Sequence, residues 1–487
     1  MKKSPALSRL LLLALITALG LIAGCTSTGG TSVSRDVSAV GECESLFVNN
    51  DKLILDAGVA DAQYARVKNF PYLRVNRLYA ALKSRLSDEK TRRAWISELA
   101  NLDHLARTIE MSNLPASIVK SDDGTAQLAR CRESLVSSAL NDKHIFEQIM
   151  AAANVPDNYR WQQRLAGLYA LSRWPVYLGV KRLQKNENPK KHTAGSANTQ
   201  HYTGYGSDTV KRTTPSPALG FPQFTELDIA GLLNRFEPVW SINTTTRSDS
   251  IGKIAWVDNK IAVDTTEPTV YRYISYALFE NRLLLQLNYT IWLPAVDSSK
   301  PLDIYAGEID GLTFRVTLDE TKTPLYADVM HNCGCYYMGF PRPSLAPILP
   351  MTTATAEPLW IPYSLPPLRD DQQYQLLVDT GKHFVRALTT TVMPSRLTHL
   401  QRQPYDALRR LERSDGGTRS AFSPRALIEN SARLERLILW PMGVISAGAM
   451  RQVGNHAIAF VGKRHFDDPE LISKHFRSAQ RPRDQNN

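Results

Sequence analysis

The segment His331-Asn332-Cys333-Gly334-Cys335 places three side chains of metal or redox chemistry within five residues. If the segment is extended, His331, Cys333 and Cys335 project from one face, because strand side chains alternate. One imidazole and two thiolates would supply three ligands of a tetrahedral zinc site or of a copper site. The candidates for a fourth ligand are His383, His456 and His465.

A disulfide between Cys333 and Cys335 competes with the metal site. Residues two apart on a strand have Cα atoms about 6.6 Å apart, at the upper end of disulfide geometry, so a turn at Gly334 is required. So small a bridge would be strained and easily reduced, which suits redox work. The sequence favours a structural bridge or inert thiols and keeps metal and redox roles as alternatives.

A second group of candidates lies near the C-terminus, where His456 and His465 occur close to Asp467. A histidine beside a carboxylate can act as an acid/base pair, and Arg451 or Arg464 would hold an anion there. However, an aspartate shortly before a proline is also the ordinary start of a helix. The favoured interpretation is therefore a final helix that begins at this position.

Glu308 and Asp310 form a third candidate pair, since both fall on one face of an extended strand. Paired carboxylates serve acid/base chemistry or bind a cation. The dipeptide Asp310-Gly311 is nevertheless typical of a tight turn between strands, and the sequence favours that turn.

Several well-known enzyme motifs do not occur in the sequence. There is no G-x-S-x-G elbow, no H-E-x-x-H helix, no phosphate-binding G-x-x-x-x-G-K-[ST] and no dinucleotide-binding glycine pattern. The sequence therefore leaves open whether the protein is an enzyme, and it assigns no cofactor.

The first 25 residues predict export. Lys2, Lys3 and Arg9 precede an apolar run that ends Leu21-Ile22-Ala23-Gly24-Cys25, which is the pattern of a secretory signal. The final Ile-Ala-Gly-Cys resembles the bacterial lipobox. This resemblance implies that residues 1–24 are a signal peptide, that Cys25 is lipidated and that acylated Cys25 holds the protein in a lipid bilayer. Thr26, in place of an aspartate, implies sorting to the outer membrane, with the chain facing the periplasm.

The chain is basic, with a formal net charge of +11, and stays basic without the three signal-peptide charges. This charge suits anionic envelope polymers such as lipopolysaccharide as candidate partners. A solvated surface of arginine and lysine explains the same charge and is the favoured interpretation. A nucleic-acid partner is not expected for an exported protein.

Four cysteines remain after Cys25, and an exported protein sits where disulfides persist. Four cysteines allow three connectivities. A bridge between Cys43 and Cys131 is favoured, because both lie in the N-terminal region.

Composition and hydrophobic period divide the chain into segments. We expect an α+β protein, with a helical domain followed by a mostly antiparallel β-rich domain, either a sandwich or a partly closed barrel with a few helices. The expected parts are a signal peptide (1–24), a lipidated flexible tether (25–41), a helical domain (42–187), a flexible linker or long loop (188–220), the β-rich domain (221–476) and a basic tail (477–487).

Two segments of the C-terminal half resemble uncharacterised proteobacterial lipoproteins. They are Tyr271 to Phe340, with Gln286-Leu287-Asn288-Tyr289, and Trp440-Pro441-Met442-Gly443 through Pro469. The resemblance implies no activity. The first functional hypothesis is an outer-membrane lipoprotein that acts as a binding or envelope-associated module. The alternative is a lipid-anchored metal-dependent or redox enzyme built around His331, Cys333 and Cys335.

Overall fold

The computed structural model describes residues 39–118, 123–187, 189, 198–205, 215–298, 301–348 and 356–479. Residues from Cys43 onward form one compact unit. The predicted signal peptide, Cys25 and most of the tether lie outside the described residues, as does most of the basic tail. The tether is predicted to end at 41, but the first helix already begins at Ala39.

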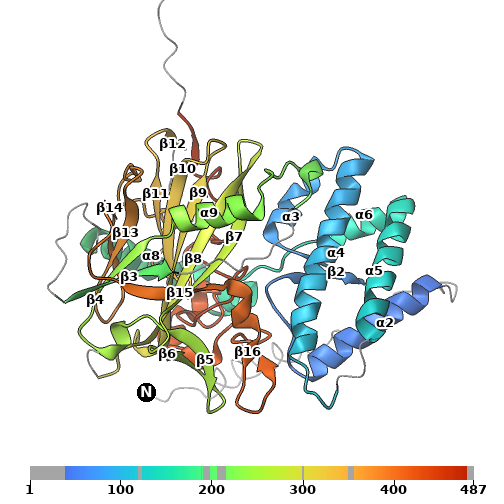
Figure 1. Cartoon of the computed structure of the whole chain (residues 1–487), viewed down its shortest axis with the longest axis horizontal. Helices are drawn as coiled ribbons and strands as arrows, with labels where there is room; N and C mark the ends of the chain where they lie inside the picture. Colours follow the sequence, from blue (N-terminus) through green and yellow to red (C-terminus); the bar gives the residue numbers. More distant parts are fainter. Residues whose placement is uncertain are drawn as a thin grey trace, which may run out of the picture. The chain divides into compact units, whose positions relative to one another are not determined.

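The N-terminal part is mainly helical (Figure 1). Its elements in chain order are α2 (Ala39–Asp56), β1 (Ala65–Val67), β2 (Phe70–Val75), α3 (Arg77–Ala81), α4 (Glu89–Ser112), α5 (Asp123–Asn141), α6 (Lys143–Ala152), α7 (Trp161–Ala166) and α8 (Tyr169–Asn186).

Helix α4 organises this part, and its sequence explains why. Asp88 caps its N-terminus, because its side chain accepts a hydrogen bond from the Thr91 amide. The Thr91 hydroxyl in turn accepts one from the Asp88 amide. The apolar stripe includes the fully buried Trp95, Ile96 and Leu99, and α4 packs against β2. The same helix carries buried charges. Asp103 and Glu110 both accept from the buried Arg74, and charges paired in this way offset much of each other's desolvation.

The C-terminal part is built around a ten-stranded sheet that curls into a half-barrel. Its strands are β3 (Thr199–Tyr205), β4 (Val239–Asn243), β7 (Thr269–Phe279), β8 (Arg282–Val296), β9 (Gly307–Leu318), β10 (Pro324–His331), β11 (Met338–Pro341), β13 (Gln373–Val378), β14 (Val385–Thr391) and β15 (Thr398–Pro404). Their order is β11-β10-β9-β8-β7-β15-β3-β4-β13-β14, with parallel pairing at β7–β15, β15–β3 and β4–β13 and antiparallel pairing elsewhere. The α+β prediction, with a partly closed sheet, is confirmed.

The remaining elements flank this sheet. They are α9 (Glu226–Arg235), the hairpin β5 (Lys253–Val257) and β6 (Lys260–Asp264), the small pairs β12 (Leu345–Pro347) with β18 (Phe476–Ser478) and β16 (Leu411–Glu412) with β17 (Thr418–Arg419), the short helix α10 (Arg436–Leu439), and the 3-10 turns η1 (Leu82–Arg85), η2 (Pro217–Leu219), η3 (Arg247–Asp249), η4 (Tyr405–Arg409), η5 (Glu429–Ser431) and η6 (Trp440–Met442).

The hairpin β7–β8 forms where the sequence predicts it. Glu280 and Asn281 connect the strands with φ of 47° and 66°, the double left-handed conformation of a two-residue hairpin turn. Residues of this long hairpin line one wall of a cavity.

Two expectations about the elements are wrong. Residues 199–205, assigned to a linker, form β3 in the interior of the sheet, because Thr-Gln-His-Tyr-Thr-Gly-Tyr can pair on both sides despite its polar composition. The helix expected to begin after Asp467 is absent. Residues 469–475 form turns that place Leu471 and Ile472 in an apolar cluster with Phe476.

Candidate functional site

A row of polar side chains crosses the sheet on one face. The strand register aligns Tyr273 of β7 with Asn288 of β8, Asn288 with Arg315 of β9, and Arg315 with Asp328 of β10. One pleat further along, Ser275 aligns with Gln286. Side chains two residues apart share a face, so the register alone gathers these groups.

Hydrogen bonds join most of this row. Asn288 Nδ2 donates to Ser275 Oγ at 3.0 Å, Ser275 donates to Gln286 Oε1 at 2.9 Å, and Gln286 donates to Thr317 at 3.1 Å. Arg315 is fixed by Asp328 and by the Phe466 carbonyl, 2.8 Å from its Nη1. These bonds fix most of the donors and acceptors of the row in place.

Two polar atoms of the row make no hydrogen bond to the described part of the chain. Tyr273 Oη and Asn288 Oδ1 are buried, and neither has a hydrogen-bond partner among the described residues. Burial also raises the pKa of Tyr273 well above its ordinary value, so its hydroxyl keeps the proton and can donate. A buried polar atom without a partner costs free energy, typically about 1–3 kcal/mol. Both residues line a cavity, which gives these atoms access to a ligand or to water.

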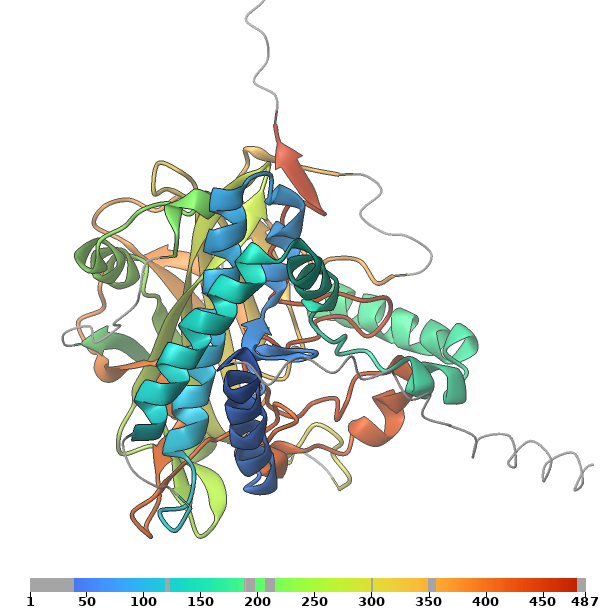
Figure 2. The same ribbon diagram turned by 90° about the vertical axis from the view of Figure 1, so that its right-hand side faces the viewer.

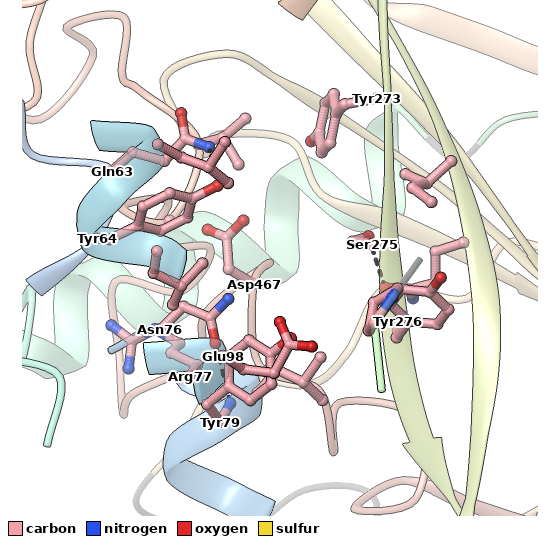
Figure 3. A pocket seen from close by; sticks show the side chains of 18 of the residues that line it. Gln63, Tyr64, Asn76, Arg77, Tyr79, Glu98, Tyr273, Ser275, Tyr276 and Asp467 are labelled. Carbon is pink, nitrogen blue, oxygen red and sulfur yellow. Dashed lines mark hydrogen bonds between the residues drawn. The ribbon is translucent and has the colours of Figure 1, made fainter. Parts of the chain in front are cut away.

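The cavity has a volume of about 440 Å³, a size typical of small-molecule sites. Its opposite wall comes from the helical part, from the loop before β1 and from α3 and α4. Figure 3 shows Tyr64, Tyr79 and Glu98 facing strand β7 across the cavity, with the Tyr273 hydroxyl turned into the gap. Tyr79 donates to Glu98 Oε2 at 3.0 Å, which holds that part of the wall in place.

Asp467 lies in the same cavity, and the structure brings it together with His456. His456 Nδ1 is 3.6 Å from Asp467 Oδ2, and the His456 amide donates to the same oxygen at 3.3 Å. Burial raises the pKa of Asp467, but the hydrogen bond and charge of His456 and the charge of Arg77 outweigh it and lower this pKa to about 2. The carboxylate is thus held ionised at the edge of the cavity.

His465 does not join this pair. Its Nε2 is 3.5 Å from Asp157 Oδ1, and its ring packs edge-on against Tyr159 with centroids 5.2 Å apart. Burial lowers the pKa of His465, so it is neutral over most of the physiological range. Of the predicted acid/base set, only His456 and Asp467 are neighbours.

The segment from His331 to Cys335 is a turn, so the extended backbone that the metal alternative requires is not present. Strand β10 ends at His331, the Gly334 amide donates to the His331 carbonyl at 2.7 Å, and Gly334 has a φ of 90°. Cys333 and Cys335 are free thiols in the structure. The hydrogen bond with Cys333 and burial raise the pKa of Cys335 well above its ordinary value, which makes its thiol a weak nucleophile.

The donor set of this turn does not fit a metal. The described residues contain no group of three or more His, Cys, Asp or Glu side chains arranged to hold an ion. Of the proposed fourth ligands, His383 is committed elsewhere: its Nδ1 bonds Asp310 at 2.8 Å and its Nε2 is 3.3 Å from Asp249. The described residues around this turn therefore lack the ligand set of a metal site.

Asp310 lies within β9, so its interpretation as part of a tight turn is wrong. It is fully buried and accepts from His383 at 2.8 Å and from Arg433 at 3.1 Å, while His331 Nδ1 is 3.5 Å away. The next position must be a glycine, because the Asn332 side chain lies against the strand there and a Cβ at Gly311 would collide with it. Glu308 instead accepts from Asn430 at the surface, so the two carboxylates do not act as a pair.

Sequence reasoning missed the polar floor of the cavity. Gln286, Asn288 and Thr290 alternate with leucines and a tyrosine along β8, which normally indicates a solvated face. All three are buried. The kind of residue could have indicated this burial. A solvated strand face usually carries charged side chains, whereas these three are neutral and form hydrogen bonds.

No protein-family model matches this chain, and no curated protein or solved structure shows significant similarity to it. Among the described residues, no helix combines the length and apolar character needed to cross a membrane.

Proposed function

We propose that the protein is a ligand-binding lipoprotein of the cell envelope and that the cavity between β7 and helices α3 and α4 is its binding site. The observation that carries this proposal is a pair of buried atoms on the floor of a cavity of about 440 Å³, Tyr273 Oη and Asn288 Oδ1, for which the described part of the chain offers no hydrogen-bond partner. A ligand that bonds to both atoms removes their desolvation cost, which favours the bound state.

The lining identifies the chemical class of the ligand. Tyrosine rings from both walls offer flat apolar surfaces, and amide side chains stand between them as donors and acceptors. Its charged groups are mostly engaged already, since Arg315 pairs with Asp328 and Glu98 accepts from Tyr79. The ligand is a small neutral molecule with hydroxyl or amide groups, and the N-acetylated sugars of the envelope have this chemistry.

The location of the protein is part of the same proposal. The signal sequence and the lipobox resemblance support a location at the outer membrane, with the chain held by acylated Cys25 and facing the periplasm. The disulfide between Cys43 and Cys131 supports export, because such bonds form and persist in oxidising compartments. The basic charge of the chain keeps anionic envelope polymers as candidate partners.

The test is calorimetric titration of the protein with N-acetylglucosamine and its β-1,4-linked disaccharide. We expect saturable binding of at least one probe. Tyr273→Phe removes a hydroxyl that has no hydrogen-bond partner among the described residues, so it should leave the melting temperature unchanged and weaken binding roughly five- to tenfold.

The matched control is Tyr271→Phe on the same strand. Its hydroxyl accepts from the Ile254 amide at 3.1 Å, and Tyr271 does not line the cavity. This variant should lose stability and keep its affinity. Equal effects of the two variants on binding, or no binding of either probe, would contradict the proposal.

A further inference from the structure

No side chain of helix α8 is fully buried, although about half of its residues are apolar. Together with α7 and the segment around α10 it exposes ten large hydrophobic residues. We name this set the α7–α8–α10 surface: Trp161, Leu165, Leu168, Leu171, Trp174, Leu178, Leu434, Leu437, Ile438 and Trp440. Apolar clusters of this size on a folded protein mark interaction sites.

The three elements form one continuous surface. Both α7 and α8 contact η6, the turn that ends α10, and Figure 2 shows α7, α8 and α10 on the same side of the structure. The inner side of the surface is firmly attached, since Arg164 donates to the carbonyls of Met442 and Gly462 at 2.8 and 2.6 Å. The apolar outer side is therefore held in a fixed place by the fold.

Charge complementarity identifies what covers this surface. No aspartate or glutamate occurs between Tyr159 and Asn186. Within residues 160–186 and 434–440, the charged residues that are exposed are all basic: Arg160, Lys181, Arg182, Lys185 and Arg436. Glu435, the acidic residue within the α10 segment, is buried, and burial raises its pKa to about 7.

Three exposed indoles complete the pattern, from Trp161, Trp174 and Trp440. Tryptophan favours the boundary between lipid headgroups and acyl chains. A helix with apolar and aromatic residues on one side and lysine and arginine around them lies in the plane of an anionic bilayer. A protein partner of ordinary composition would not require so one-sided a charge.

We propose that the α7–α8–α10 surface docks in the interfacial layer of a bilayer that contains anionic phospholipid. The three elements lie flat in the membrane plane, with the indoles at headgroup depth and the basic residues on the phosphates. This contact is separate from acylation at Cys25, and it would fix the orientation of the chain on the membrane. It does not depend on the ligand proposed for the cavity.

The test is hydrogen exchange of the full chain with vesicles of phosphatidylglycerol and phosphatidylcholine in equal parts. The readout is local, because the N-terminal signal and lipidation site give the chain a membrane affinity of their own. We expect exchange in residues 161–186 and 434–440 to slow at least about fivefold, and α9 to stay unchanged. Vesicles of phosphatidylcholine alone, or 0.5 M salt, should reduce the effect.

The variant Leu168→Gln/Leu171→Gln/Leu178→Gln should abolish this protection without lowering the melting temperature, because all three side chains are exposed. Leu227→Gln on α9, which is 84% exposed, is the matched control and should keep full protection. The proposal is overturned by absence of protection, by equal protection with neutral vesicles, or by a concentration-dependent dimer that protects the segments without lipid.

Discussion

His383 is the residue whose protonation the fold controls most directly. It is fully buried between Asp249 and Asp310, with ring nitrogens 3.3 and 2.8 Å from their carboxylates. Burial alone would lower its pKa, but the close contact with the Asp249 carboxylate, the hydrogen bond to Asp310 and the two negative charges raise it to about 9. The imidazolium is thus a structural cation that links the loop between β13 and β14 to β9.

This arrangement predicts how stability depends on pH. A histidine with a folded-state pKa of about 9 and an unfolded value near 6.5 stabilises the fold fully below pH 6.5 and loses that contribution as pH rises toward 9. Glu435, with a pKa of about 7, has mostly titrated by pH 7.5. Between pH 7.5 and 9.5 the free energy of unfolding should therefore fall by roughly 2 kcal/mol.

Denaturant melts at several pH values measure this slope. His383→Gln should be destabilised at pH 7 and should lose the slope, since glutamine does not titrate. His144→Gln, at an exposed position, should keep it. A slope that survives in His383→Gln would show that another group causes it.

At the scale of elements, the disulfide between Cys43 and Cys131 joins α2 to α5 across 88 residues of chain. The prediction of this pair from the sequence is confirmed. Closing a loop of that length stabilises the fold by about 4–5 kcal/mol in the chain-entropy model.

Cys43→Ser/Cys131→Ser should accordingly lower the free energy of unfolding by several kcal/mol, and reductant should not lower it further. Cys333→Ser/Cys335→Ser serves as the control, because both residues are free thiols in the structure. That variant should respond to reductant as the wild type does. If reductant still shifts the melt of Cys43→Ser/Cys131→Ser, then Cys333 and Cys335 form a bridge in solution.

At the scale of the whole molecule, anchoring at Cys25 stays a prediction from the sequence. The wild-type chain should begin at an acylated Cys25, and Cys25→Ser should retain the signal peptide. Intact-mass measurement of both proteins from membranes distinguishes these forms. The same mature mass in both would end the lipoprotein assignment.

Local features follow directly from the order of the residues. Alternating apolar residues around Glu280-Asn281 specify the β7–β8 hairpin, because strand periodicity and turn chemistry act over a few residues. The division into helical and β-rich parts follows from the same short-range patterns. The Cys43–Cys131 pair was favoured because few pairings were open and both cysteines lie in the same region.

The cavity, in contrast, depends on contacts between residues far apart in the sequence. Tyr273, Asn288 and Arg315 become neighbours through strand register, and the helical wall joins them through packing over long sequence separations. No local pattern encodes such contacts. Asp310-Gly311 has the composition of a turn, but pairing with β8 and the close approach of Asn332 keep it within a strand. Segments with weak local preference, such as β3, take their structure from the sheet that surrounds them.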